Sequence, residues 1–265
     1  MKCNEPTSLN MDQVSTLQQA LSANQEELFQ LLLSPDIKIV TVLLKNPHLT
    51  EDHLLALLKR RDLPETLLKI IHQRHTTQLS HRLLLALVKN PNIPGALMRN
   101  LLPHLRLFEL VDLCFMPGVT PDQKMAAERV IIQRLPTTPL GNKMTLARRA
   151  TSTVVGALLK DGDSQLVDIC LNSPRLTEAA VFQFINGPRA NATTLSMVAR
   201  NNRWKSRPNL QLALLKNRLT PTVWFTLWIP RLPLHTINQL LASRRLNPAQ
   251  KRAIQDAVAR RKKNR

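Results

Sequence analysis

The feature that most constrains the fold is an internal repeat. When the sequence is shifted by 127 positions, residues 10–136 align with residues 137–263 without a gap. The segment LALVKN at residues 85–90 falls on LALLKN at residues 212–217. Three prolines of the first half keep the same register: Pro94, Pro103 and Pro121 fall on Pro221, Pro230 and Pro248. A shared register of prolines and leucines over this length indicates a duplication, so we expect two copies, residues 1–136 and 137–265, that superpose without insertion.

The apolar pattern within both copies is that of short helices. Leucines at positions 54, 55, 57 and 58 follow the period of 3.6 residues that marks one buried helix face. Thr50 and Thr120 precede acidic first turns and have the chemistry of N-caps. Aromatic residues make up only 3% of the chain, and a leucine-rich core suits packed helices better than sheets. We therefore expect an all-α fold of helices with about 8–14 residues, joined by short turns.

Short amphipathic helices in tandem cannot bury their apolar faces alone, so they stack into an α-solenoid. The string LALVKNPNIP at residues 85–94 resembles the leucine-rich repeat variant, in which Asn-Pro ends a helix and Thr-Pro or Ile-Pro follows two residues later. The second copy departs from this pattern, because Arg218 stands where the first has Pro91. More broadly, the chain is similar to bacterial HEAT and armadillo-like arrays. The resemblance implies a right-handed curved stack that binds a partner, and it implies no catalytic activity.

The two copies differ sharply in charge. Residues 1–136 hold 15 Lys+Arg and 13 Asp+Glu, whereas residues 137–265 hold 22 and 5. Acids of the first copy are replaced in the second: Asp52 aligns with Ala179, and Asp62 aligns with Arg189. After residue 178 the only acid is Asp256. The second copy therefore has a surface of one sign that the first copy lacks.

A surface whose charges are nearly all positive destabilises the folded state, because the charges repel one another. Binding to a polyanion offsets this repulsion. Most of the added cations fall at predicted turns or helix ends, which line up along the edges of a solenoid. The alternative is a merely solvated charged face. The sequence predicts polyanion-binding residues at Arg200, Arg203, Trp204, Lys205, Arg207, Lys216, Arg218, Arg231, Arg244, Arg245 and Arg252.

The tryptophans divide into two kinds. Trp224 and Trp228 align with Leu97 and Leu101 of the first copy, so we expect both to be largely buried. Trp204 aligns with Thr77 and has basic neighbours on both sides. Such a tryptophan either stacks on a base or caps a pair of helices. We expect it to keep an exposed face, and we expect its basic neighbours to contribute little to stability.

Three classes of function remain open. The leading hypothesis is a non-enzymatic α-solenoid scaffold whose basic half docks a polyanion, most simply nucleic acid, while the first half is free for a protein partner. The second is a protein–protein scaffold for an acidic protein or an anionic membrane surface. The third is a HEAT-like DNA glycosylase for alkylated bases, which needs a carboxylate in a basic cleft. The carboxylates nearest the basic region are Asp168, Glu178 and Asp256.

The remaining chemistry is sparse. Cys3, Cys114 and Cys170 are odd in number and far apart, so they indicate free thiols in a reducing compartment. The N-terminus has no apolar signal region and no segment is long enough to span a bilayer, so we expect a cytoplasmic protein. No nucleophile–base pair, glycine-rich phosphate loop or metal-ligand spacing stands out. We therefore expect no cofactor, no metal and no enzymatic activity.

Overall fold

The computed structural model describes residues 11–75 and 79–263. All regular elements in these ranges are helices, and no strand occurs among them, which confirms the predicted all-α class. Contacts divide the chain into two units, Met1–Val130 and Ile131–Arg265. We call these unit 1 and unit 2. None of the described helices is long and apolar enough to cross a lipid bilayer.

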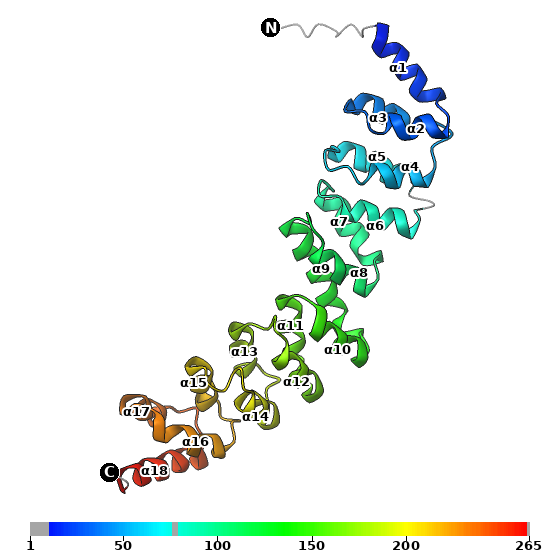
Figure 1. Ribbon diagram of the computed structural model, residues 1–265. Helices are drawn as coiled ribbons and strands as arrows, with labels where there is room; N and C mark the ends of the chain where they lie inside the picture. Colours follow the sequence, from blue (N-terminus) through cyan, green and yellow to red (C-terminus); the bar gives the residue numbers. More distant parts are fainter. Residues whose placement is uncertain (1–10, 76–78, 264–265) are drawn as a thin grey trace, which may run out of the picture. The chain divides into compact units, whose positions relative to one another are not determined.

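Unit 1 is an array in which helices pack on their neighbours in the chain and on the helix after next (Figure 1). Its helices are α1 (Met11–Ser22), α2 (Gln25–Leu31), α3 (Ile37–Leu43), α4 (Glu51–Leu57), α5 (Glu65–His75), α6 (His81–Lys89), α7 (Gly95–Leu101), η2 (Leu102–His104), α8 (Leu107–Phe115) and α9 (Pro121–Arg134), which extends past the unit boundary. Helix α1 packs on α3, α2 on both α3 and α4, and α4 on α6. Each helix thus buries its apolar face between others, as tandem helical repeats do.

Unit 2 repeats this packing. Its elements are η3 (Leu135–Thr137), α10 (Leu140–Arg149), α11 (Ser152–Leu159), α12 (Ser164–Asn172), α13 (Glu178–Ile185), α14 (Ala192–Arg200), α15 (Pro208–Lys216), α16 (Thr222–Trp228), η4 (Ile229–Arg231), α17 (Leu234–Ala242) and α18 (Pro248–Lys263). Helices α11, α13 and α15 pack in succession as one layer, while α10, α12 and α14 pack as another (Figure 1). The layer of α11, α13 and α15 carries the candidate site described below.

Helix starts recur at an interval of 127 residues. Helices α2 to α9 begin at residues 25, 37, 51, 65, 81, 95, 107 and 121, and helices α11 to α18 begin at residues 152, 164, 178, 192, 208, 222, 234 and 248. Local signals account for several of these starts. Thr50 and Thr120 lie directly before α4 and α9, as predicted. At α9 the cap is reciprocal, because the Thr120 N–H donates to Gln123 Oε1 at 2.8 Å and the Gln123 N–H donates to Thr120 Oγ1 at 3.2 Å.

Candidate functional site

The ten cations predicted as polyanion contacts are all exposed. They lie at helix ends and in connections rather than on one helix. Arg200 ends α14, and Lys216 ends α15. Arg231 ends η4, and Arg252 lies on α18. The others lie between helices: Arg203, Lys205 and Arg207 before α15, Arg218 before α16, and Arg244 and Arg245 before α18.

The expected exposed face of Trp204 is wrong. Its side chain is only 3% exposed, and its indole Nε1–H donates to the Leu171 carbonyl at 2.9 Å. A buried indole N–H needs such an acceptor. Thr77, the residue that aligns with Trp204, lies outside the described residues. Trp204 therefore joins the α14–α15 connection to the end of α12 and offers no free face for stacking.

Arg203 is also occupied within the protein. Its guanidinium donates to the carbonyls of Ser173 and Leu176 at 2.6 and 2.8 Å, and more weakly to that of Pro174 at 3.3 Å. It also lies 4.4 Å from the Trp204 ring centroid. We had expected Arg203 to contribute little to stability. Its bonds to these carbonyls, which lie in the turn after α12, indicate a structural role instead.

Lys205 and Arg207, which follow Arg203, make fewer contacts within the protein. Lys205 Nζ donates to Asn202 Oδ1 at 2.7 Å, and Arg207 lies 3.8 Å from a carboxylate oxygen of Glu178. Both contacts are exposed, so they contribute little to stability.

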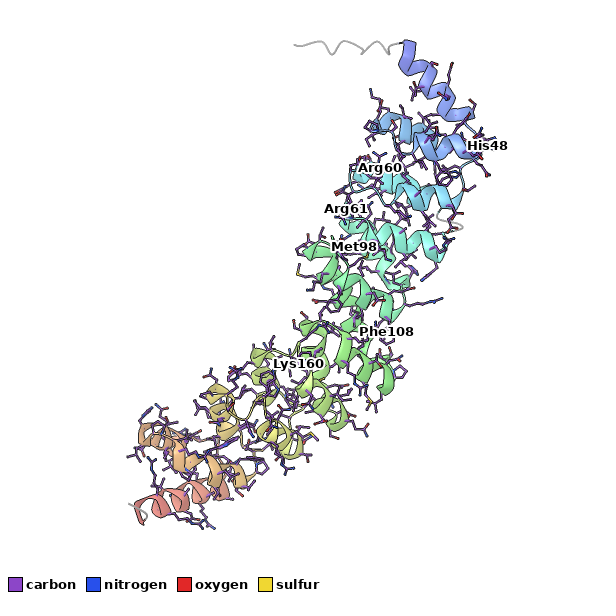
Figure 2. The ribbon with its side chains drawn as sticks, viewed as in Figure 1. His48, Arg60, Arg61, Met98, Phe108 and Lys160 are labelled. Carbon is purple, nitrogen blue, oxygen red and sulfur yellow. The ribbon has the colours of Figure 1, made fainter. Side chains whose placement is uncertain are left out.

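Three adjoining hollows of about 780, 770 and 690 Å³ run along α11, α13 and α15. The first and second share Lys160 and Arg189, whereas the second and third share Phe182 and Arg245. Lys216 lines the third. Because neighbouring hollows have walls in common, we treat them as one surface and call it the basic groove. Figure 2 labels Lys160 next to the end of α11.

The four cations of the basic groove face little opposing charge. Among the described residues, the side chains of Lys160, Arg189, Lys216 and Arg245 form no ion pair or hydrogen bond. The two acids of the groove are engaged elsewhere. Asp161 pairs with Lys143 at 2.7 Å, and Glu178 pairs with Arg207 at 3.8 Å. The groove is therefore positive and open to an anionic ligand.

The sequence missed three residues of this groove: Lys160, Arg189 and Phe182. The register of the two copies contained a signal for two of them, because Arg189 aligns with Asp62 and Phe182 aligns with Leu55. Phe182 is 46% exposed on the wall between two hollows. Phe182 thus supplies the exposed aromatic ring that we had expected at Trp204.

The backbone of Arg189 packs closely against Gly162. Gly162 has φ +74°, and a Cβ at this position would lie 2.7 Å from the Arg189 carbonyl oxygen. Only glycine combines this conformation with the space available. The loop after α11 thus packs against the loop after α13 and fixes the origin of the Arg189 side chain.

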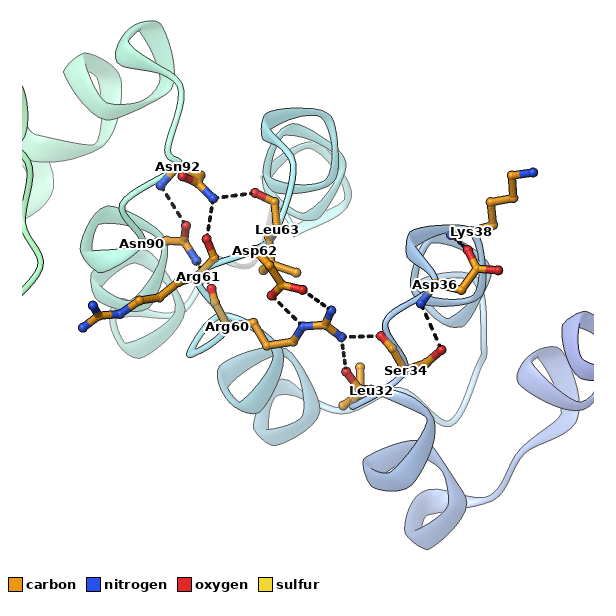
Figure 3. Close-up of polar contacts among 10 residues, drawn as sticks. All are labelled: Leu32, Ser34, Asp36, Lys38, Arg60, Arg61, Asp62, Leu63, Asn90 and Asn92. Carbon is orange, nitrogen blue, oxygen red and sulfur yellow. Dashed lines mark hydrogen bonds and ion pairs between the residues drawn. The ribbon is translucent and has the colours of Figure 1, made fainter.

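Unit 1 has a different arrangement at the loop aligned with Arg189. There, Arg60 donates to both carboxylate oxygens of Asp62 at 3.0 and 2.6 Å, and to the carbonyls of Leu32 and Ser34 at 2.7 Å (Figure 3). The hydrogen bond from Arg60 lowers the pKa of the Asp62 carboxyl. In unit 2, Gly187 and Arg189 take these two positions. Where unit 1 has an internal ion pair, the aligned positions of unit 2 hold a glycine and a cation that lines the groove.

Trp224 is 9% exposed, as expected, and its Nε1–H donates to Ser196 Oγ at 3.1 Å. Trp228 is half-buried against the core of unit 2, and its ring centroid lies 5.4 Å from that of Trp224. The prediction for Trp228 therefore holds only in part, because its side chain is half-buried rather than largely buried.

The carboxylates considered for a glycosylase lie on three separate helices. Glu178 begins α13 and lines the third hollow, whereas Asp168 and Asp256 are exposed on α12 and α18. Cys114 and Cys170 are free and buried. Burial raises the pKa of the Cys114 thiol to about 11 and that of Cys170 to about 12, so both are poor nucleophiles. Cys3 lies outside the described residues.

The described residues contain no cluster of three or more His, Cys, Asp or Glu side chains that would hold a metal ion. Chemically, the groove offers fixed cations and one exposed aromatic ring, which suit binding to an anionic chain. No protein-family model, curated protein or solved structure matches this chain.

Proposed function

We propose that unit 2 is a non-enzymatic docking module for nucleic acid and that the basic groove is its binding surface. One observation carries this proposal: Lys160, Arg189, Lys216 and Arg245 line adjoining hollows and have no partner among the described side chains. A nucleic-acid backbone has closely spaced phosphates, and neutralising them with Lys and Arg releases condensed counterions. This release favours binding without any reading of sequence.

The exposed ring of Phe182 favours a nucleic acid over a simple polyanion. It lies between cations on the wall of the groove. Proteins that bind single strands combine a positive groove with aromatic rings on which bases stack, and stacking tolerates any base. Phe182 takes the stacking role, which was one of the two alternatives for Trp204.

We also propose that the two units are copies of one helical array and form a right-handed α-solenoid of the HEAT or armadillo-like type. Support comes from eight helix starts that recur at the interval of 127 residues. Superposition of residues 38–134 on residues 165–261 without insertion is the expected result. The exchange of the Arg60–Asp62 pair for Gly187 and Arg189 then belongs to the divergence of the second copy.

Nucleic-acid binding is tested by removing three groove cations together. In the variant with Arg189, Lys216 and Arg245 replaced by Gln, log affinity for a labelled oligodeoxythymidylate should depend less steeply on log salt. On a single strand, each phosphate that the protein no longer neutralises lowers the slope by about 0.7, so the expected change is about two units. The measurement is fluorescence anisotropy over a range of salt concentrations.

A matched control removes the same charge elsewhere. Lys38, Arg99 and Lys124 are exposed cations of unit 1, and replacing all three by Gln gives the same net charge as the groove variant. This control should keep the slope of the parent protein. An equal reduction of the slope in both variants would assign binding to overall charge rather than to the groove. An unchanged slope in the groove variant, or no binding at low salt, would refute the proposal.

The second candidate is a scaffold for an acidic protein segment. It is favoured by an apolar row on one face of α16, where Val223 and Leu227 are 54% and 53% exposed, preceded by Leu219 at 44%. Arg218 and Arg231 lie near the two ends of this row. None of these five residues lines the basic groove, so binding of an acidic amphipathic peptide to this row should persist in the groove variant. Titration of the groove variant with such a peptide therefore separates this candidate from the first.

A further inference from the structure

Unit 1 contains a hollow of about 700 Å³ at the same register as the third hollow of the basic groove. Of the ten residues that line the third hollow, nine align at the interval of 127 with residues that line the hollow of unit 1. Among these pairs, Lys89 corresponds to Lys216 and Leu55 corresponds to Phe182. The two hollows therefore occupy equivalent places in the two helical arrays.

The hollow of unit 1 is basic although unit 1 as a whole is nearly neutral. It is lined by Lys59, Arg61, Arg82 and Lys89, and by one acid, Asp52. Arg82 lies 3.6 Å from the Asp52 carboxylate, and both side chains are 71% exposed. Within the described part of the chain, the side chains of Lys59, Arg61 and Lys89 have no ion pair or hydrogen bond. Three cations thus remain for a ligand.

Arg61 lies close to a glycine of a neighbouring loop. Its guanidinium lies against Gly118, where an added Cβ would be 2.9 Å from Arg61 Nη2. Gly118 also has φ +84°, so this backbone favours glycine. Glycine at this place leaves room for the planar Arg61 cation at the wall of the hollow (Arg61 is labelled in Figure 2).

An exposed aromatic ring completes the resemblance to the basic groove. Phe29 lines the hollow and is 46% exposed. One part of its ring packs against His53, with centroids 4.2 Å apart. In unit 2 the exposed ring is Phe182, while Gly156 takes the position of Phe29. Each hollow therefore has one aromatic ring beside several cations, supplied from different helices.

We infer that the hollow of unit 1 is a second site for single-stranded nucleic acid, so that one chain binds two short strands. Its cations contact phosphates, and the Phe29 ring stacks on a base. The inference rests on the function proposed above for the identity of its ligand. It departs from the hypothesis that the first half is free for a protein partner, because only one acid, Asp52, lines the hollow of unit 1.

The test measures how many strands one chain binds. Isothermal titration of the full chain with an oligodeoxythymidylate of about six nucleotides, at about 50 mM salt, should give two strands per chain. The double variant with Lys59 and Lys89 replaced by Gln should bind one, and so should the groove variant with Arg189, Lys216 and Arg245 replaced by Gln. Combining both sets should abolish binding. The Lys38, Arg99 and Lys124 control should still bind two, and circular dichroism verifies that each variant is folded.

The outcomes separate this inference from the proposed function. One strand per chain, lost only in the groove variant, overturns the second site and leaves the proposed function of unit 2 standing. Two strands per chain that persist when Lys59 and Lys89 are replaced overturn the assignment to this hollow. No strand bound by the parent chain overturns both proposals.

Discussion

At the scale of single residues, arginines in this protein have two kinds of role. Arg60 and Arg203 direct their guanidinium groups at backbone carbonyls about 30 positions earlier in the chain. The free carbonyls at a helix end need such donors, because they have no partner within their own helix. Arg189 and Arg245 instead line the basic groove, where the charge is available to a ligand. Arg203 and Arg245 are both exposed, so accessibility alone does not separate the two roles.

Replacing Arg203 by Gln should destabilise the protein. The change removes charge-assisted bonds to Ser173 and Leu176, and hydrogen bonds to charged groups contribute about 1.5–3 kcal/mol. A loss of about 2 kcal/mol in the free energy of unfolding is expected from urea denaturation. Lys205→Gln is the control, since among the described residues its side chain bonds only to the neighbouring Asn202, and it should change stability by less than about 0.5 kcal/mol. Equal effects of the two substitutions would contradict a structural role for Arg203.

At the scale of helices, buried amide side chains join successive turns of each array. Asn90 Nδ2 donates to the carbonyls of Leu58 and Arg60 at 3.0 and 2.8 Å. Asn217, its equivalent in unit 2, donates to the Ile185 carbonyl at 2.6 Å. These bonds tie the end of one helix to the loop two helices later, so they fix the spacing between these helices as well as satisfying the carbonyls.

Gln250 makes the most extensive of these links. Its Nε2 donates to the carbonyls of Asn217, Arg218 and Thr220 at 3.2, 3.2 and 2.8 Å, and its side chain is fully buried. Gln250→Ala leaves these acceptors without their donor, so the free energy of unfolding should fall by about 2–3 kcal/mol. Thermal denaturation followed by circular dichroism measures the effect.

Matched substitutions make the result specific. Gln123 is the equivalent residue of unit 1 and donates to the carbonyls of Val88 and Asn90, so Gln123→Ala should destabilise by a similar amount. Gln255 is exposed on α18, and Gln255→Ala should be neutral. A neutral Gln250→Ala would show that these amides do not hold successive helices together.

The helices were predictable because their signals are local, whereas the site was not. Pro121 and Pro248 begin helices in both units, and Thr50 precedes an acidic first turn. The burial of Trp204 depended on a carbonyl of Leu171, 33 residues earlier, which no local pattern reveals. Likewise, the groove joins residues from several loops, and only the packing of α11, α13 and α15 brings them together. The sequence showed that Arg189 aligns with Asp62, but it did not show that the Arg189 side chain lines a groove.

At the scale of the whole molecule, charge is divided very unevenly between the units. Unit 1 holds 14 Lys+Arg against 13 Asp+Glu, for a net charge of +1, whereas unit 2 holds 23 against 5, for a net charge of +18. Like charges in unit 2 repel one another in the folded state, and this repulsion opposes folding. In unit 1 attractive and repulsive pairs nearly balance. Salt should therefore act on the two units in different ways.

Raising the sodium chloride concentration from about 20 to about 200 mM should stabilise unit 2 selectively. The screening length falls from about 30 Å at 0.01 M to about 10 Å at 0.1 M, so repulsion between exposed cations weakens. A gain of about 1 kcal/mol would slow the exchange of its most protected amides about five-fold. Hydrogen exchange read by mass spectrometry, peptide by peptide, resolves the two units in one experiment. Sucrose is the uncharged control and should slow exchange in both units alike. If salt slowed exchange equally in both units, the charge asymmetry would have no energetic consequence, and self-repulsion could no longer be a reason for unit 2 to bind a polyanion.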